Sequence, residues 1–229
     1  MRRLWVISIL FGCVSLSSVG LAGEKEEGFV SMFNGNDLTG WEGKPGGWWV
    51  EDGAITSQST TENPCVKHHY LYWTGAEPAD FVLRFQYKLV GGNSGVQIRS
   101  EKRPNWDTWG YQADMEAGKQ WTGCLFQHQR GGVVMRGKKA VIAEDGTRTE
   151  DEFASGDDLQ DKVKADDWND YEISAKGSKI VLKINDQLMC QVDDRDTTLA
   201  CKKGIIALQM HPGPPMKVQF RKMRIKILD

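Results

Sequence analysis

The sequence has 229 residues, and its 29 Lys and Arg against 31 Asp and Glu give a formal net charge of −2. A nearly balanced charge without a basic run argues against a nucleic-acid-binding protein. After the N-terminal segment, the length suits one large all-β domain, and no stretch approaches the ~20 consecutive apolar residues of a membrane-spanning helix.

The N-terminus has the organisation of an export signal. Arg2 and Arg3 precede an apolar stretch at residues 4–16, and small residues surround a cleavage position at residues 20–22. We therefore predict a signal peptide at residues 1–22, one domain at residues 23–229, and a periplasmic or secreted location. Lipid attachment at Cys13 is the alternative.

Short alternating segments separated by turn residues follow along the rest of the chain. Such segments are typical of a β-sandwich with little helix. Residues 137–166 are rich in acids and poor in aromatics, which predicts a mobile surface loop with a short helix at residues 157–164. The predicted strands and hairpins, in chain order, lie at residues 29–36, 48–55 (turning at Asp52-Gly53), 81–89, 93–99, 110–116, 171–177, 179–192 (turning at Asn185-Asp186), 204–211 and 218–227.

Four cysteines remain after the predicted signal peptide: Cys65, Cys124, Cys190 and Cys201. An even number in an exported protein permits disulfides, and Cys190 with Cys201 is the easiest pair because a turn-rich segment separates them. Free buried thiols are an equally open interpretation. Their spacing does not match a zinc site.

Four predicted strands, at residues 93–99, 110–116, 171–177 and 204–211, carry polar residues on one face only. Because side chains alternate along a strand, the polar residues of each segment point away from its apolar ones. Amide, guanidinium, carboxyl and imidazole groups are suited to holding a polar ligand or moving a proton. These one-sided polar pairs are Gln97 with Arg99, Gln112 with Asp114, and Gln209 with His211, and Asn93 lies in the turn before the first of them.

Aromatic residues gather at residues 101–129. Trp106, Trp109, Trp121 and Phe126 lie there, with His128 close by. Aromatic faces stack on sugar rings, but such clusters also anchor loops, and both interpretations stay open.

Eight short motifs follow one another along the chain, at residues 32–41, 48–53, 80–87, 92–99, from 110 onward, 168–173, 204–211 and 220–225. Their order and spacing resemble the 3-keto-disaccharide hydrolase domain family over nearly the whole chain after the signal. The resemblance implies a concanavalin-like jelly-roll sandwich of two antiparallel sheets, with its site on the concave sheet. It also implies cleavage of 3-keto-glycosides, with an upstream sugar 3-dehydrogenase as an expected partner.

For this chemistry we predict three catalytic residues. His211 is the candidate base or acid, since imidazole titrates near neutral pH. Arg99 is the candidate stabiliser of an enolate, and Asp114 either orients His211 or carries a second proton. The candidate substrate-binding residues are Asn93, Gln97, Gln112, Gln209, Trp109, Trp121 and His128.

Several alternatives remain. Gln112 and Gln86 stand where the family usually has Glu, which favours a non-catalytic carbohydrate-binding module. Gln112 also cannot be the nucleophile of a retaining glycosidase, which needs a carboxylate. Arg99 and Asp114 would form only a buried ion pair in the structural interpretation. No cofactor is certain, although Asp114, His211 and Glu116 offer ligands for a divalent metal ion.

Overall fold

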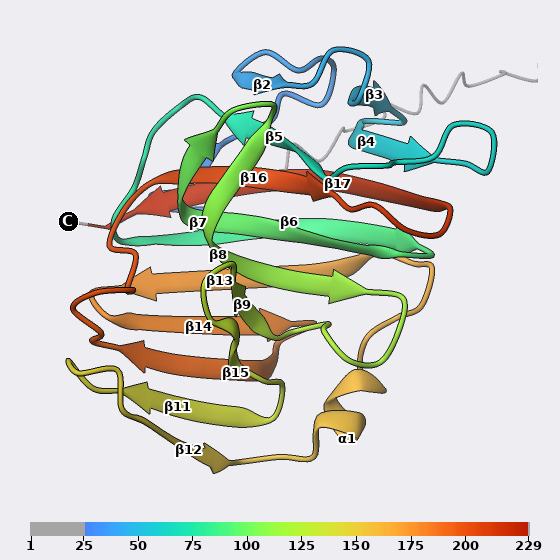
Figure 1. Cartoon of the computed structure of the whole chain (residues 1–229). Helices are drawn as coiled ribbons and strands as arrows, with labels where there is room; N and C mark the ends of the chain where they lie inside the picture. The colour runs from blue at the N-terminus through green and yellow to red at the C-terminus, as the bar shows by residue number, and fades with distance from the viewer. Residues whose placement is uncertain (1–25, 229) are drawn as a thin grey trace, which may run out of the picture.

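The computed structural model of the protein describes residues 26–228. The predicted signal peptide and Cys13 lie outside these residues. Two β-sheets pack face to face, as Figure 1 shows. The apolar core lies between them. The predicted all-β sandwich is therefore confirmed.

The larger sheet has ten strands, in the order β12-β11-β15-β14-β13-β6-β17-β4-β3, with β1 paired to β17. Its central strand β6 spans Phe81–Val90 and lies between β13 and β17. The other strands are β1 (Val30–Ser31), β3 (Trp49–Glu51), β4 (Ala54–Ser59), β11 (Lys138–Ile142), β12 (Arg148–Glu152), β13 (Asn169–Lys176), β14 (Lys179–Ile184), β15 (Gln187–Asp194) and β17 (Met216–Ile227).

The smaller sheet has seven strands, in the order β10-β9-β8-β7-β16-β5-β2. Of its three middle strands, β7 and β8 form a hairpin, whereas β16 comes from a distant part of the sequence, so tertiary pairing sets the register of β16 on β7. The strands are β2 (Trp41–Gly43), β5 (His69–Trp73), β7 (Asn93–Arg103), β8 (Asp107–Glu116), β9 (Leu125–Gln127), β10 (Gly131–Val134) and β16 (Ile205–Met210).

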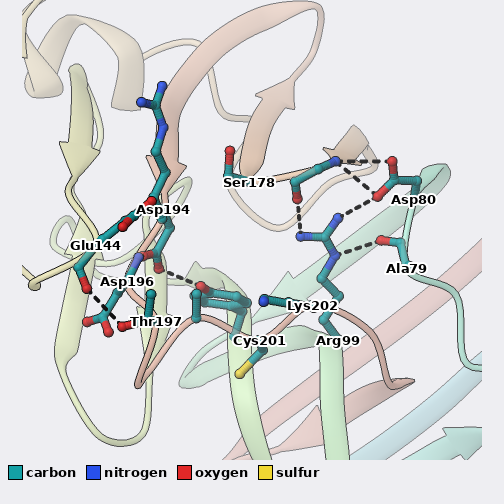
Figure 2. Close-up of a pocket in the computed structure, with 14 residues that line it drawn as sticks. Ala79, Asp80, Arg99, Glu144, Ser178, Asp194, Asp196, Thr197, Cys201 and Lys202 are labelled. Atoms are coloured by element: carbon teal, nitrogen blue, oxygen red, sulfur yellow. Dashed lines mark hydrogen bonds and ion pairs between the residues drawn. The ribbon is translucent and has the colours of Figure 1, made fainter.

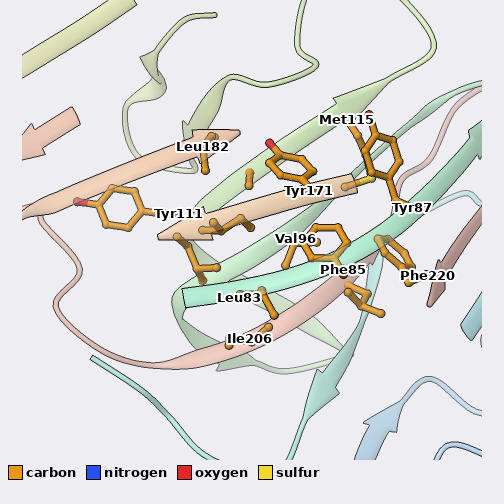
Figure 3. Packing of buried hydrophobic residues seen from close by; sticks show 14 of the residues in the cluster. Leu83, Phe85, Tyr87, Val96, Tyr111, Met115, Tyr171, Leu182, Ile206 and Phe220 are labelled. Carbon is orange, nitrogen blue, oxygen red and sulfur yellow. The ribbon is translucent and has the colours of Figure 1, made fainter. Parts of the chain in front are cut away.

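The core follows from the alternation that the sequence predicts. Along β6, buried residues alternate with half-buried ones, so that Leu83 and Phe85 point inward and Arg84 points outward. Phe85 stacks on Tyr171 of β13, with ring centroids 5.2 Å apart (Figure 3). Val96 and Met115 of the smaller sheet belong to the same buried cluster and pack from the opposite side.

Both predicted two-residue hairpin turns are present. Asp52 and Gly53 join β3 to β4 with φ values of 51° and 71°, and Asn185 and Asp186 join β14 to β15 with φ values of 49° and 63°. Positive φ at both central residues matches the right-handed twist of the adjoining strands.

Two expectations about the larger sheet were wrong. The sheet is mixed, because β11 pairs with β15 in parallel; these strands are far apart in the sequence, so no tight turn imposes the antiparallel direction. Residues 137–166 also form more than a mobile loop, since they contain the β11–β12 hairpin. Every residue of β12 is exposed at the sheet edge, which removes the apolar alternation by which a strand is recognised.

The helix in this segment is α1, at Gly156–Gln160, shorter than predicted. Ser155 caps it by accepting a hydrogen bond from the Asp158 amide. The described residues contain no helix with the length and hydropathy needed to cross a membrane.

All four cysteines among the described residues are free thiols, so Cys190 and Cys201 do not form the disulfide that the spacing allowed. Cys124 and Cys190 are buried, and burial raises the pKa of both thiols; that of Cys124 reaches about 11. These two thiols are therefore protonated near neutral pH.

Candidate active site

A pocket of about 300 Å³ lies over the outer face of the seven-stranded sheet. The strands beneath it, β7, β8 and β16, are buried over most of their length on both faces, unlike a strand with one face in water. Seven of the ten predicted site residues line it: Asn93, Gln112, Asp114, Trp121, His128, Gln209 and His211.

Strand register brings the polar residues together. Gln97 of β7 pairs with Gln112 of β8, and Gly95 pairs with Asp114. Gly95 has no side chain, and a Cβ built there would lie 2.5 Å from Cγ of Gln112. The Gln112 amide therefore occupies the space above Gly95. From there it contacts Gln97 of β7 and Gln209 of β16.

The amides form an oriented hydrogen-bond network at the floor of the pocket. Gln112 Nε2 donates to Asp114 Oδ1 at 2.6 Å and to Gln209 Oε1 at 3.1 Å. Gln97 Nε2 donates to Gln112 Oε1 at 2.8 Å, and Gln209 Nε2 donates to the Tyr70 hydroxyl at 2.8 Å. Because each amide is both donor and acceptor, this chain fixes the orientation of all three.

Asp114 is a buried carboxyl group facing the pocket, and its residue is only 3% exposed. Burial raises its pKa well above the ordinary value, and the nearby Glu116 charge raises it further, while the hydrogen bond from Gln112 lowers it. Only Oδ1 has a hydrogen-bond partner among residues 26–228. Desolvation dominates, so this carboxyl is suited to hold a proton and donate it to a ligand.

His211 follows β16 directly and is half-buried. Its Nδ1 lies 2.5 Å from the carbonyl oxygen of Pro212. Since a carbonyl only accepts hydrogen bonds, we assign the proton of the neutral ring to Nδ1. This tautomer leaves a lone pair on Nε2, as a general base requires.

Aromatic rings form one wall of the pocket. Trp121 contacts Phe126 edge to face with centroids 5.9 Å apart, and Phe126 contacts His128 at 5.6 Å. His128 also stacks on Trp109 at 5.4 Å. Burial lowers the pKa of His128, so this imidazole is neutral near pH 7.

Arg99 does not join this site, which corrects its predicted position. A β-bulge interrupts β7 between Ile98 and Glu101, and Arg99 at the bulge has a φ of 47°. The bulge breaks the two-residue alternation from which its direction was predicted. Arg99 therefore points away from Gln97 and lies at a different cavity, of about 490 Å³ (Figure 2).

The contacts of Arg99 there are structural. Its guanidinium donates to the carbonyl oxygens of Ala79 and Gly177, at 2.7 and 2.8 Å, and pairs with Asp80 at 3.0 Å (Figure 2). Its ion-pair partner is thus Asp80, so the alternative of a pair with Asp114 was wrong as well.

Two further predicted residues support the pocket without lining it. Gln97 is fully buried beneath Gln112 and orients its amide. Trp109 has the Arg103 guanidinium 5.0 Å from its ring centroid in addition to its contact with His128. It therefore positions His128 and is not a residue of the pocket surface.

Of the three predicted metal ligands, Asp114 and His211 line the pocket, whereas Glu116 does not. Glu116 Oε2 accepts the backbone N–H groups of Gln120 and Trp121, at 3.1 and 3.0 Å, which fixes the turn after β8. Within the described part of the chain, His, Cys, Asp and Glu side chains form no group of three or more that could hold a metal ion.

The pocket contains two residues that were not among the predicted site residues, His68 and Phe126. Phe126 belongs to the aromatic cluster seen in the sequence. His68 lies just before β5 and has no sequence motif around it, so no signal in the sequence placed it at the site.

A β-sandwich with hydrogen-bonding amides, a proton-holding carboxyl, imidazoles and an aromatic wall in one pocket has the features of a carbohydrate-active protein. A profile of the 3-keto-alpha-glucoside-1,2-lyase-like domain matches residues 28–226. The chain belongs to this family. It has no significant match among curated proteins.

Several solved structures share this fold. A protein from Parabacteroides distasonis, provisionally described as a glycosyl hydrolase, is 20% identical with a TM-score of 0.60, covering 87% of this chain and 99% of its own. The carbohydrate-binding module CBM66 from Bacillus subtilis is 13% identical with a TM-score of 0.55, covering 83% and 98%. A family GH16 endo-beta-1,3(4)-glucanase is 10% identical with a TM-score of 0.51, covering 87% and 91%. At these identities the likeness concerns the fold.

Proposed function

We propose that this protein cleaves the glycosidic bond of 3-keto-glycosides by elimination followed by hydration. The observation that carries the proposal is the meeting of Asp114, whose pKa is raised, and His211, with a free Nε2 lone pair, in one sugar-sized pocket. Family membership agrees with it.

The carbonyl at C3 acidifies the hydrogen on C2. His211 Nε2 removes this proton, and the electron pair forms the enolate of the C3 carbonyl. The enolate collapses, a C1–C2 double bond forms, and the glycosidic oxygen leaves C1 with a proton. Addition of water at C1 and return of a proton to C2 give 3-keto-glucose.

Asp114 replaces Arg99 as the group that stabilises the enolate in this proposal. A protonated carboxyl in an apolar environment donates a strong hydrogen bond to a developing oxyanion, and Gln112 holds the Asp114 carboxyl in place. Asn93 and Gln209 offer hydrogen bonds to sugar hydroxyls, while Trp121 and Phe126 offer apolar contact with the ring.

A non-catalytic carbohydrate-binding module is the second candidate. It is favoured by the central position of the neutral Gln112 amide, and by the fold shared with a carbohydrate-binding module. Such a module would bind the sugar without proton transfer by Asp114 or His211.

Incubation of the purified protein with 3-keto-trehalose and, separately, with trehalose distinguishes these candidates. We expect release of 3-keto-glucose from the oxidised sugar alone, and loss of release in a folded His211→Ala variant. Sugar binding without turnover of either compound would contradict the enzyme and support the binding module. A parallel reaction with chelator tests the divalent metal, which stays a prediction.

Export and the partner enzyme complete the proposal. Release of residues 1–22 is tested by N-terminal sequencing of the protein recovered outside the cytoplasm. An enzyme that oxidises glucosides at C3 is the expected source of the substrate, and adding one should make plain glucosides cleavable.

A further inference from the structure

His68 is a third imidazole in the pocket, beside His128 and His211, and the proposed reaction has so far given it no task. Its Nε2 lies 2.9 Å from Oδ1 of Asp107, at the start of β8. The His68 and Asp107 side chains are 31% and 27% exposed, so the pair lies at the rim of the pocket, where a ligand can reach it.

The surrounding backbone fixes this pair. The Tyr70 amide donates to the carbonyl oxygen of Trp106 at 2.8 Å, and the Tyr72 hydroxyl donates to that of Asp107 at 2.8 Å. Asn105 and Trp106 have φ values of 63° and 62°, and this conformation is costly for a bulky residue such as Trp106. The strained β7–β8 turn thus holds Asp107 against the residue that precedes β5.

The His68–Asp107 contact is short, but its angles are not those of a hydrogen bond. Nε2 of His68 is buried and makes no hydrogen bond of acceptable geometry in the described residues, despite its distance of 2.9 Å from the carboxylate. A buried, unsatisfied ring nitrogen calls for an explanation, and catalytic hydrogen bonds often align only when substrate binds. No hydrogen bond of Nδ1 occurs in the same residues, so the second nitrogen is available to a ligand.

We propose that His68, positioned by Asp107, is the catalytic acid–base group for the leaving glycosidic oxygen and for the attacking water. This inference rests on the proposed function of the pocket and adds the proton source that the elimination needs. The substrates that require it are 3-keto-glycosides with an alcohol or a second sugar as leaving group, because an alkoxide leaves poorly without a proton.

In each turnover His68 gives one proton and takes one back. While the C1–O bond breaks, the bonding electron pair goes to oxygen and the protonated His68 gives that oxygen its Nδ1 proton. The resulting neutral ring then takes a proton from water, whose oxygen bonds to C1. The electron pair of the C1–C2 double bond takes the proton held by His211, which returns both imidazoles to their starting states.

The other groups of the pocket are less suited to this step. Asp114 is buried at the pocket floor and hydrogen-bonded to Gln112, and His128 is confined between the rings of Trp109 and Phe126. Burial also lowers the pKa of His128, so it holds no acidic proton to give near neutral pH. A ring nitrogen of His68 lies 2.9 Å from the Asp107 carboxylate, which balances the charge of the doubly protonated ring.

The test compares two leaving groups in His68→Gln. We expect turnover of 3-keto-trehalose to fall by about 100-fold or more, and that of 4-nitrophenyl 3-keto-glucoside by less than about tenfold, since nitrophenolate leaves without a proton. Asp107→Asn should show the same dependence on the leaving group more weakly. Lys67→Gln, at the exposed neighbouring position, is the control and should match the wild type.

A second readout separates this inference from the proposed function. In D2O, His68→Gln should still exchange the C2 hydrogen of 3-keto-trehalose at no less than about a third of the wild-type turnover rate, because His211 is intact. Equal losses with both leaving groups, or loss of C2 exchange, would overturn the role of His68. Absence of both turnover and C2 exchange in the wild type would instead overturn the proposed function, and this role with it.

Discussion

Asp114 shows how a single buried side chain acquires its chemistry from its surroundings. The same carboxyl group on an exposed strand would be ionised. In β8 the burial of Asp114 favours the protonated form of its carboxyl group. Gln112 opposes that effect through one short hydrogen bond and at the same time fixes the direction of the carboxyl group. The protonation of Asp114 therefore affects both the pH dependence of the free energy of unfolding and the proposed reaction.

Replacing Asp114 with Asn keeps the acceptor oxygen for Gln112 and removes the ionisation. The folded pKa lies above the unfolded value of ~3.9, so between these values the unfolded state binds fewer protons and stability falls as pH rises. Urea unfolding should therefore show wild type losing stability relative to Asp114→Asn above about pH 4, with a plateau beyond the folded pKa. Turnover should fall by about 100-fold or more.

Asp151→Asn, on the exposed edge strand β12, is the matched control and should track the wild type at every pH. A stability difference between wild type and Asp114→Asn that does not change with pH would contradict the raised pKa.

At the scale of elements, the site depends on the pairing of β7 with β8 and β16. The missing side chain of Gly95 leaves room for the Gln112 amide, and the adjacent Gln209 on β16 completes its contacts. A one-residue change of register would reverse the face on which these groups lie. The bulge at Arg99 reverses the face locally. The alternation therefore predicts the face of Gln97 correctly and that of Arg99 incorrectly.

Gly95→Ala tests the packing of Gln112 at its closest point. The new methyl group would lie 2.5 Å from Cγ of Gln112, so the amide must move and its hydrogen bond to Asp114 must lengthen. We expect turnover to fall by roughly tenfold while the protein stays folded, since the loss of one positioned hydrogen bond is worth about 1–2 kcal/mol. Turnover equal to wild type would show that Gln112 does not position Asp114.

At the scale of the whole molecule, the two sheets are held by the apolar core and by a polar connection near one end. Arg99 of the seven-stranded sheet contacts the β13–β14 turn through Gly177 and the approach to β6 through Ala79 and Asp80. The Arg99 side chain is only 2% exposed, so its donors have little access to water, whereas Ala79 and Gly177 are exposed residues.

Arg99→Lys retains the charge but loses the fork of donors that reaches all three partners. We expect the free energy of unfolding to fall by about 1.5–3 kcal/mol, because a buried cation keeps fewer of its hydrogen bonds. Arg195→Lys, which alters an exposed pair with Asp193, is the control and should unfold at the same urea concentration as wild type. Equal stability of Arg99→Lys and wild type would refute the structural role of Arg99.

The local pattern of the sequence determined most of the long strands, the two hairpin turns, the sandwich and most of the pocket's polar residues. These features depend on side-chain alternation and turn chemistry, which short segments carry by themselves. Tertiary structure alone decided the direction of Arg99, the pairing of β11 with β15, and the meeting of His68 with Asp107. The physical reason is that a bulge, a parallel pairing and a contact across 39 residues depend on how distant segments pack, and no single segment records that packing.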